Sequence, residues 1–228
     1  MATFAAHDAR MTNTLSPTDP RTHFAHAVIT ARAVVDGVRP DQLTLPTVCD
    51  ELDVRSMLGH MLIVLRRITA LGNGDDPMAM PHVATGIADD AWSSAFQADA
   101  HAVQAAWTDD AKLEQIMVLP WATVPGAAML DMYTSELTVH TWDLALATGQ
   151  AVQWHEPTLQ AALASALQAL PSGDREAYFA QLALDPAFTP DLATRPPFRT
   201  AVAVTDGAST LDRLIGWYGR QPQSPSAA

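Results

Sequence analysis

Two residues that commonly bind metals lie one helical turn apart near the middle of the chain. Glu136 and His140 are separated by four positions in a segment with helical periodicity, so both side chains leave the same face of the predicted helix. A third such residue, His60, interrupts an apolar stretch of another predicted helix. Two imidazoles and one carboxylate leave coordination positions open for water or substrate, as catalytic metals require. We therefore predict a divalent metal site formed by His60, Glu136 and His140.

The same residues permit a plainer interpretation. In it, His60 is a buried histidine satisfied by Glu136 or by a backbone carbonyl, and His140 is a half-exposed surface residue. The other histidines are weaker candidates for metal ligands. His23 and His26 lie three positions apart near a helix start, with no third partner in view. The remaining four, expected to be solvated in the tail, in loops or on mixed helix faces, are His7, His82, His101 and His155.

Six helices are predicted, because apolar residues recur every three or four positions in six segments. Asp53 is placed to cap the second helix, and Gly149 is placed to end the fourth. The expected helices run from Arg21 to Val35, from Val54 to about Leu71, from Asp90 through Trp107, from Pro125 to Gly149, from Pro157 to Leu170 and from about Ala208 to Tyr218.

The connections between these helices complete the expected fold. We expect a short irregular hairpin within Lys112–Thr123, no regular structure over Pro171–Pro197, and a short strand over Ala201–Val204. Four long helices with a crossover-length linker between the second and third favour a mainly α fold built on a four-helix bundle. The expected organisation is a flexible tail over residues 1–20, the bundle over 21–150, and a helix-containing extension packed on it over 151–228.

Composition and charge narrow the classes of function. The 228 residues include 25 acidic and 13 basic side chains, a net charge of −12 that repels phosphate backbones and argues against nucleic-acid binding. The apolar runs are too interrupted for a membrane span. Cys49 is the single cysteine, so an internal disulfide is impossible, and no basic neighbour within two residues favours it as a nucleophile. With no apolar signal region near Met1, we expect a cytoplasmic protein.

Three segments carry a resemblance to a known family. They read VRPDQLTLPTVCDELDVRSMLGHML, VPGAAMLDMYTSELTVHTWDLALATGQ and DRLIGWYGRQP. Together they resemble the actinobacterial metal-binding relatives of mycothiol-dependent maleylpyruvate isomerase, within the wider DinB-like group. The resemblance implies a DinB-like four-helix bundle with a divalent metal, usually zinc, held by residues that fall here on His60, Glu136 and His140. Nickel and iron are the other candidates for the metal.

The resemblance also implies the chemistry. In thiol-dependent relatives, the metal presents the thiolate of a small thiol such as mycothiol to an electrophilic substrate. The expected partners are therefore a small-molecule electrophile and a thiol, without nucleic acid or membrane, and a homodimer would suit such a bundle. We expect a metal-dependent thiol transferase or isomerase; the alternative is a metal-binding or helical interaction module without turnover.

Three further residues are candidates for supporting roles. Arg67 follows His60 by two helical turns on nearly the same face, so it is placed to pair with a carboxylate of the thiol or substrate, or else to be solvated. Asp143, three positions after His140, is placed to orient that ligand or to pair with an arginine. Tyr133, three positions before Glu136, is a candidate donor to a bound oxyanion, although such spacing is also typical of core packing.

Overall fold

The computed structural model describes residues 16, 18–49, 51–184 and 198–223. Within these residues the chain is mainly helical and contains one antiparallel sheet of two strands. The predicted mainly α fold class is confirmed at this level. None of the helices in the described ranges is long and apolar enough to cross a membrane. The expected N-terminal tail lies outside the described residues up to position 15.

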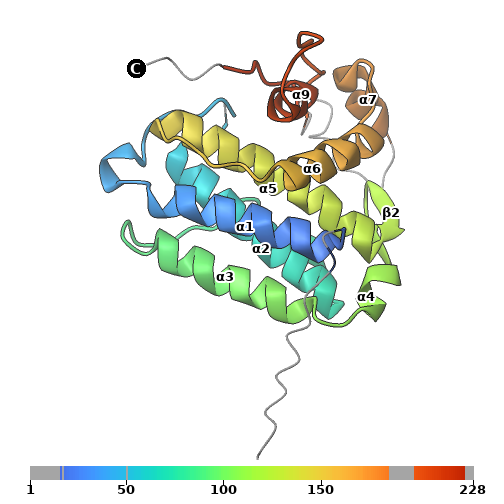
Figure 1. Cartoon of the computed structure of the whole chain (residues 1–228). Coiled ribbons are helices and arrows are strands. Elements are labelled where there is room, and N and C mark those ends of the chain that lie inside the picture. The colour runs from blue at the N-terminus through green and yellow to red at the C-terminus, as the bar shows by residue number, and fades with distance from the viewer. Residues whose placement is uncertain (1–15, 17, 50, 185–197, 224–228) are drawn as a thin grey trace, which may run out of the picture.

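Four long helices pack side by side around one apolar core (Figure 1). Both α1 and α2 contact both α3 and α5, so the four helices form a closed ring of neighbours. Each helix contributes fully buried side chains to the shared core, such as Met61 and Leu137. The helices are α1 (Pro20–Asp36), α2 (Val54–Asn73), α3 (Trp92–Ala106) and α5 (Gly126–Thr148).

The predicted helix ends are largely confirmed. Asp53 accepts a hydrogen bond from the backbone N–H of Ser56 at the start of α2, which satisfies one of the free donors of the first turn. Gly149 follows α5 with a φ of 68°, a left-handed conformation that glycine adopts without steric cost. Pro125 is the cap of α5 rather than its first residue. Two short 3-10 turns, η1 (Pro40–Gln42) and η2 (Pro77–Ala79), lie in the connections on either side of α2.

The predicted hairpin between the third and fourth long helices is confirmed, with a different beginning. Lys112 belongs to a single helical turn, α4 (Ala111–Glu114), and the strands β1 (Ile116–Leu119) and β2 (Ala122–Pro125) follow it. Met117 and Leu119 point into the core, as the alternation of a strand requires. The hairpin therefore closes one end of the apolar core.

The C-terminal part forms a second apolar cluster against the outer face of α5. Helix α6 (Glu156–Ala169) packs on α5, and α9 (Thr210–Trp217) packs on α6. Val139 and Trp142 of α5 belong to this second cluster, together with residues of α6 and α9 such as Leu159 and Ile215. Helix α5 is therefore shared by both cores, which explains why it is buried on nearly all sides.

Two predictions for this region are wrong. The segment expected to be irregular contains α7 (Arg175–Leu182), which begins where the Asp174 side chain accepts a hydrogen bond from the backbone N–H of Ala177. Residues 185–197 of the same segment lie outside the described ranges. The expected strand at 201–204 is not a strand, because Val202 donates its N–H to the carbonyl of Gly216 at the end of α9 instead of to another strand.

Candidate metal centre

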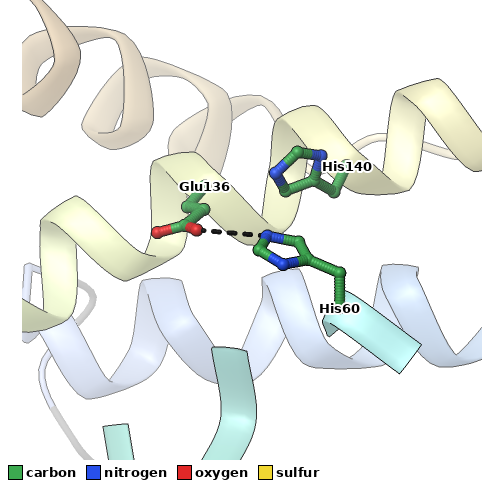
Figure 2. Close-up of side chains that lie close together, drawn as sticks. All are labelled: His60, Glu136 and His140. Carbon is green, nitrogen blue, oxygen red and sulfur yellow. Dashed lines mark ion pairs between the residues drawn. The ribbon is translucent and has the colours of Figure 1, made fainter. Parts of the chain in front are cut away.

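Helices α2 and α5 bring His60, Glu136 and His140 together in one place. One ligand atom from each of the three lies within 4.8 Å of the others. Figure 2 shows His60 on α2 and the other two on α5, with both rings and the carboxylate turned toward one another. The exposed fraction of the side chain is 5% for His60, 27% for Glu136 and 11% for His140. The group is thus largely enclosed, and its more open side is at Glu136.

A glycine next to His60 allows a connecting segment to approach α2 closely. A Cβ at Gly59 would lie 2.5 Å from the carbonyl oxygen of Ala84, and the N–H of Ala84 donates to the carbonyl of Gly59. Only a residue without a side chain fits this approach. As a result, the segment that follows η2 lies against the helix, and the carbonyl of His82 comes within 3.1 Å of Nδ1 of His60.

This contact determines which nitrogen of His60 faces the site. A carbonyl oxygen only accepts hydrogen bonds, so Nδ1 of His60 carries the proton that it donates to His82. In the neutral ring, Nε2 then holds a lone pair, and this atom lies 3.5 Å from Oε1 of Glu136. Two acceptors face each other across this distance.

Nδ1 of His140, like that of His60, contacts a hydrogen-bond acceptor. Nδ1 of His140 lies 3.0 Å from Oδ2 of Asp143, a carboxylate with no exposed surface. Arg220 binds the same carboxylate with two hydrogen bonds, of 2.6 Å from Nε and 2.7 Å from Nη2. Burial alone would raise the pKa of Asp143, but the charge of Arg220 and the hydrogen bonds from His140 and Arg220 outweigh it and hold the pKa below its usual value. Asp143 therefore stays ionised and accepts the Nδ1 proton, which leaves Nε2 of His140 available.

The charges around Glu136 favour its ionised form. Burial alone would raise the pKa of Glu136. At the low pH where a carboxyl titrates, however, a protonated His60 would donate to it, and the charges of His60, His140 and Arg67 add to this effect, so that the pKa is lowered. The pKa of His140 is lowered, mainly because burial disfavours its protonated form. An ionised carboxylate next to neutral imidazoles is the protonation state in which these residues bind metals.

The spacing of two of the three ligand atoms matches that around a metal ion, and all three lie within 4.8 Å of one another. Two ligands that each lie about 2.0 to 2.1 Å from one tetrahedral zinc are separated by about 3.4 Å. The 3.5 Å between Nε2 of His60 and Oε1 of Glu136 matches this spacing. The buried His-Glu-His group can therefore hold a metal ion, as predicted from the sequence. The part of the plainer interpretation that made His140 half-exposed is wrong, because this residue is only 9% exposed.

The two other candidates predicted from the sequence also lie near the centre. Nη2 of Arg67 is 3.4 Å from the carbonyl of Pro81. Tyr133 is 5% exposed, and its pKa is raised by burial and by the nearby charge of Glu136. Asp143 contacts both His140 and an arginine, so the two roles that the sequence left open for it occur together.

Two contributions to the site were missed by sequence reasoning. Arg220 lies 77 positions after Asp143, and only its presence in the third segment of the family resemblance could have drawn attention to it. His82 was expected to be a solvated loop histidine. Its side chain is exposed, yet its ring centroid is 4.6 Å from that of His60 and its carbonyl orients that ligand. No signal in the sequence indicates such a backbone contact.

His23, His26, His101 and His155 lie away from this group, and His7 falls outside the residues that the structure describes. His26 of α1 stacks on His155, which precedes α6, with ring centroids 3.8 Å apart, and the pKa of His23 is lowered by burial and by these two neighbours. His101 is an exposed residue of α3. In the described part of the chain, His60, Glu136 and His140 form the one group of three or more potential ligands that converges closely enough to hold a metal ion.

Comparison with known proteins finds two similar proteins from Mycobacterium tuberculosis. They are uncharacterized protein Rv0738 of strain H37Rv and uncharacterized protein MT0763 of strain CDC 1551. Each is 28% identical to this chain over 139 residues, which cover 60% of this chain and 71% of the relative. No protein-family profile matches the chain, and no solved structure is significantly similar to it. The chain is thus similar to mycobacterial proteins whose names state no activity, and any function must be argued from the metal centre itself.

Proposed function

We propose that the chain binds one divalent metal ion through His60, Glu136 and His140, with zinc as the first candidate and nickel or iron as the others. The observation that carries the proposal is the arrangement of acceptors. In both imidazoles Nδ1 donates a hydrogen bond to an acceptor, which leaves Nε2 with a lone pair. These two lone pairs and one carboxylate converge in a largely enclosed group. Converging acceptors repel one another unless a cation lies between them. A metal ion removes this repulsion and uses all three groups.

We further propose that the site serves a metal-dependent thiol transferase or isomerase. A divalent metal bound there supplies a positive centre that lowers the pKa of a thiol or water. The chain provides a three-residue ligand set, which leaves a coordination position for a further ligand, and Glu136 is the most exposed of the three side chains. Asp143 keeps His140 in one orientation and tautomer. The resemblance of three segments to mycothiol-dependent relatives is the reason for naming a thiol.

Metal content per chain tests the first part of the proposal. We expect about one equivalent of zinc in the purified protein, and a loss of at least 90% of it in His60→Ala, Glu136→Gln and His140→Ala, each checked for folding by circular dichroism. His101→Ala, which changes an exposed histidine on α3, is the matched control and should retain the metal. A wild-type protein that takes up no zinc after dialysis against the metal would overturn the proposal.

The second part is tested by activity. The zinc-loaded protein is incubated with a chromogenic aryl halide, with and without a small thiol, and the thioether formed is measured. We expect a thiol-dependent rate above background that disappears in Glu136→Gln. A full complement of zinc without any thiol-dependent chemistry would instead favour the alternative of a metal-binding module without turnover.

A further inference from the structure

Arg67 lies next to the metal centre because both contact the same short segment. The carbonyl of Pro81 accepts from Nη2 of Arg67, and the carbonyl of the next residue, His82, accepts from Nδ1 of His60. Arg67 and His60 are seven positions apart on α2, and side chains of a helix lean toward its N-terminus, so the arginine reaches back toward the histidine. The guanidinium therefore lies on the side of α2 that carries His60, and its charge acts on Glu136.

The hydrogen-bonding capacity of Arg67 is mostly unused. Its Nε is buried and has no hydrogen-bond partner among the described residues, and the contact to Pro81 is long, at 3.4 Å. The neighbouring Arg66 differs, because its Nε donates to Asp99 of α3 over 2.7 Å. A guanidinium offers five N–H donors in a planar arrangement that matches the two oxygens of a carboxylate. Arg67 therefore has donors free for a bidentate anion.

With a metal bound, the site would carry an excess of positive charge that favours an anionic ligand. A divalent ion on two neutral imidazoles and one carboxylate retains one positive charge, and Arg67 adds a second. The charges of Asp143 and Arg220 cancel each other in their ion pair. Glu136 is partly exposed, and Pro81 and His82, whose carbonyls contact Arg67 and His60, are exposed. An anionic ligand can reach these residues from solvent and would compensate the excess charge.

We propose that Arg67 binds the carboxylate of a small organic acid whose other end, a thiol or an oxygen, reaches the metal. This inference rests on the proposed function, since it presupposes a metal on His60, Glu136 and His140. Arg67 is then a specificity-determining residue: it selects ligands that carry a carboxylate a few bonds away from the group that binds the metal. Tyr133 lies one helical turn before Glu136 on α5, and the charges of Glu136 and Arg67 both act on its hydroxyl.

The test compares two thiols that differ in a carboxylate. The protein is loaded with Co²⁺, whose visible spectrum reports on its ligands, and is titrated with mercaptoacetate or with 2-mercaptoethanol. We expect wild type to bind mercaptoacetate at least tenfold more tightly than 2-mercaptoethanol. In Arg67→Met this preference should fall to within about twofold, while the affinity for 2-mercaptoethanol and the cobalt content stay unchanged. Arg66→Met is the matched control and should keep the preference.

The outcomes separate this inference from the proposed function. If Co²⁺ is not bound, both fail. If Co²⁺ is bound and 2-mercaptoethanol changes the spectrum, but wild type shows no preference for mercaptoacetate or Arg67→Met retains it, this inference alone is overturned. Should Arg67→Met fold poorly, Arg67→Lys keeps the long side chain and its charge but not the bidentate geometry, and it should lose several-fold of the preference. Equal preference in Arg67→Lys and wild type would then overturn the inference.

Discussion

At the candidate metal centre, the positions of two imidazole protons decide which nitrogen atoms can bind a metal ion. Nδ1 of His60 donates to a backbone carbonyl, and Nδ1 of His140 donates to Asp143. These contacts fix both tautomers before any ligand arrives, because neither acceptor can donate in return. The ring nitrogens that remain are the ones that face Glu136. Residues outside the ligand set thus decide whether the ligands are ready to bind.

Asp143→Asn tests the importance of this orientation at the level of one residue. The substitution keeps the shape of the side chain but leaves Arg220 largely buried without a counter-charge, which should cost about 3 to 5 kcal/mol of unfolding free energy. Zinc affinity should fall by about 10- to 100-fold, because His140 loses its charged acceptor. Chemical denaturation and competition with a zinc chelator measure the two effects.

The control for this variant is Asp99→Asn. Asp99 pairs with Arg66, which is considerably more exposed, so that its loss should cost about 0 to 1 kcal/mol and leave zinc affinity unchanged. Equal losses of stability in the two variants would contradict the role given to the buried pair.

At the scale of elements, the site needs a particular contact between α2 and the segment that follows η2. Gly59 makes this contact possible, because any Cβ there would collide with the backbone at Ala84. The same approach brings the carbonyls of Pro81 and His82 to Arg67 and His60. A glycine within an apolar helix thus has a role in positioning a ligand, although it contributes no functional group.

Gly59→Ala should therefore affect the site as well as the fold. The backbone at Ala84 must move by several tenths of an ångström, at a cost of about 1 to 3 kcal/mol in unfolding free energy, and the contact between His82 and His60 should weaken. We expect a lower zinc affinity, measured by chelator competition. Gly207→Ala, where an added Cβ meets no atom within 4 Å, should change neither quantity; a similar effect there would contradict this explanation.

Sequence reasoning succeeded where the determining contacts are local. The four-residue spacing of Glu136 and His140 fixes their common face within one helix, and the cap at Asp53 satisfies a donor three positions away. It failed where contacts are distant. Arg220 reaches Asp143 across 77 positions, and the proline-rich surroundings of α7 concealed a short helix that begins at the local cap Asp174. The expected strand over 201–204 failed for a similar reason, since its partner is the end of a helix.

At the scale of the whole molecule, two apolar cores meet along α5, and α1 also contacts α6. This second contact contains the stacked rings of His26 and His155 and the nearby His23. The pKa of His23 is lowered by burial and by the two other histidines, with Asp19 opposing the shift, and the pKa of His155 is lowered by burial and by His26. The junction between the cores therefore disfavours protonation of His23 and His155.

The contribution of these histidines to stability should accordingly fall in mild acid, whereas Asp131, whose pKa burial raises to about 6, acts in the opposite direction. Above the ordinary histidine pKa of 6.5, both the folded and the unfolded chain carry neutral rings, and these groups have no effect. Below it, the unfolded chain binds protons more readily than the folded chain does. The unfolding free energy therefore decreases as the pH falls, until the pH is below the lowered pKa values of the folded chain. Denaturant titrations at pH 7.5 and 5.5 measure this decrease.

The contribution of the junction to this pH dependence is the difference between wild type and a variant that lacks one of its histidines. His82 and His140 also have lowered pKa values and act in the same pH range, so wild type is compared with His155→Gln, in which we expect a smaller decrease. His101→Gln, an exposed residue, should behave like wild type. If His155→Gln and wild type lose equal stability between the two pH values, the junction does not sense pH.

The ion pair between Asp143 and Arg220 has a consequence for the order in which the protein is made. Chains are synthesised from the N-terminus and fold as they emerge. His60, Glu136, His140 and Asp143 are present long before Arg220 is added, so a nascent chain has every metal ligand while Asp143 still lacks its counter-charge. A ribosome-bound chain that ends shortly before Arg220 should hold zinc more weakly than a chain that includes this residue. We therefore expect full metal affinity only after Arg220 has been added, when the helices that carry the candidate ligands have already been synthesised.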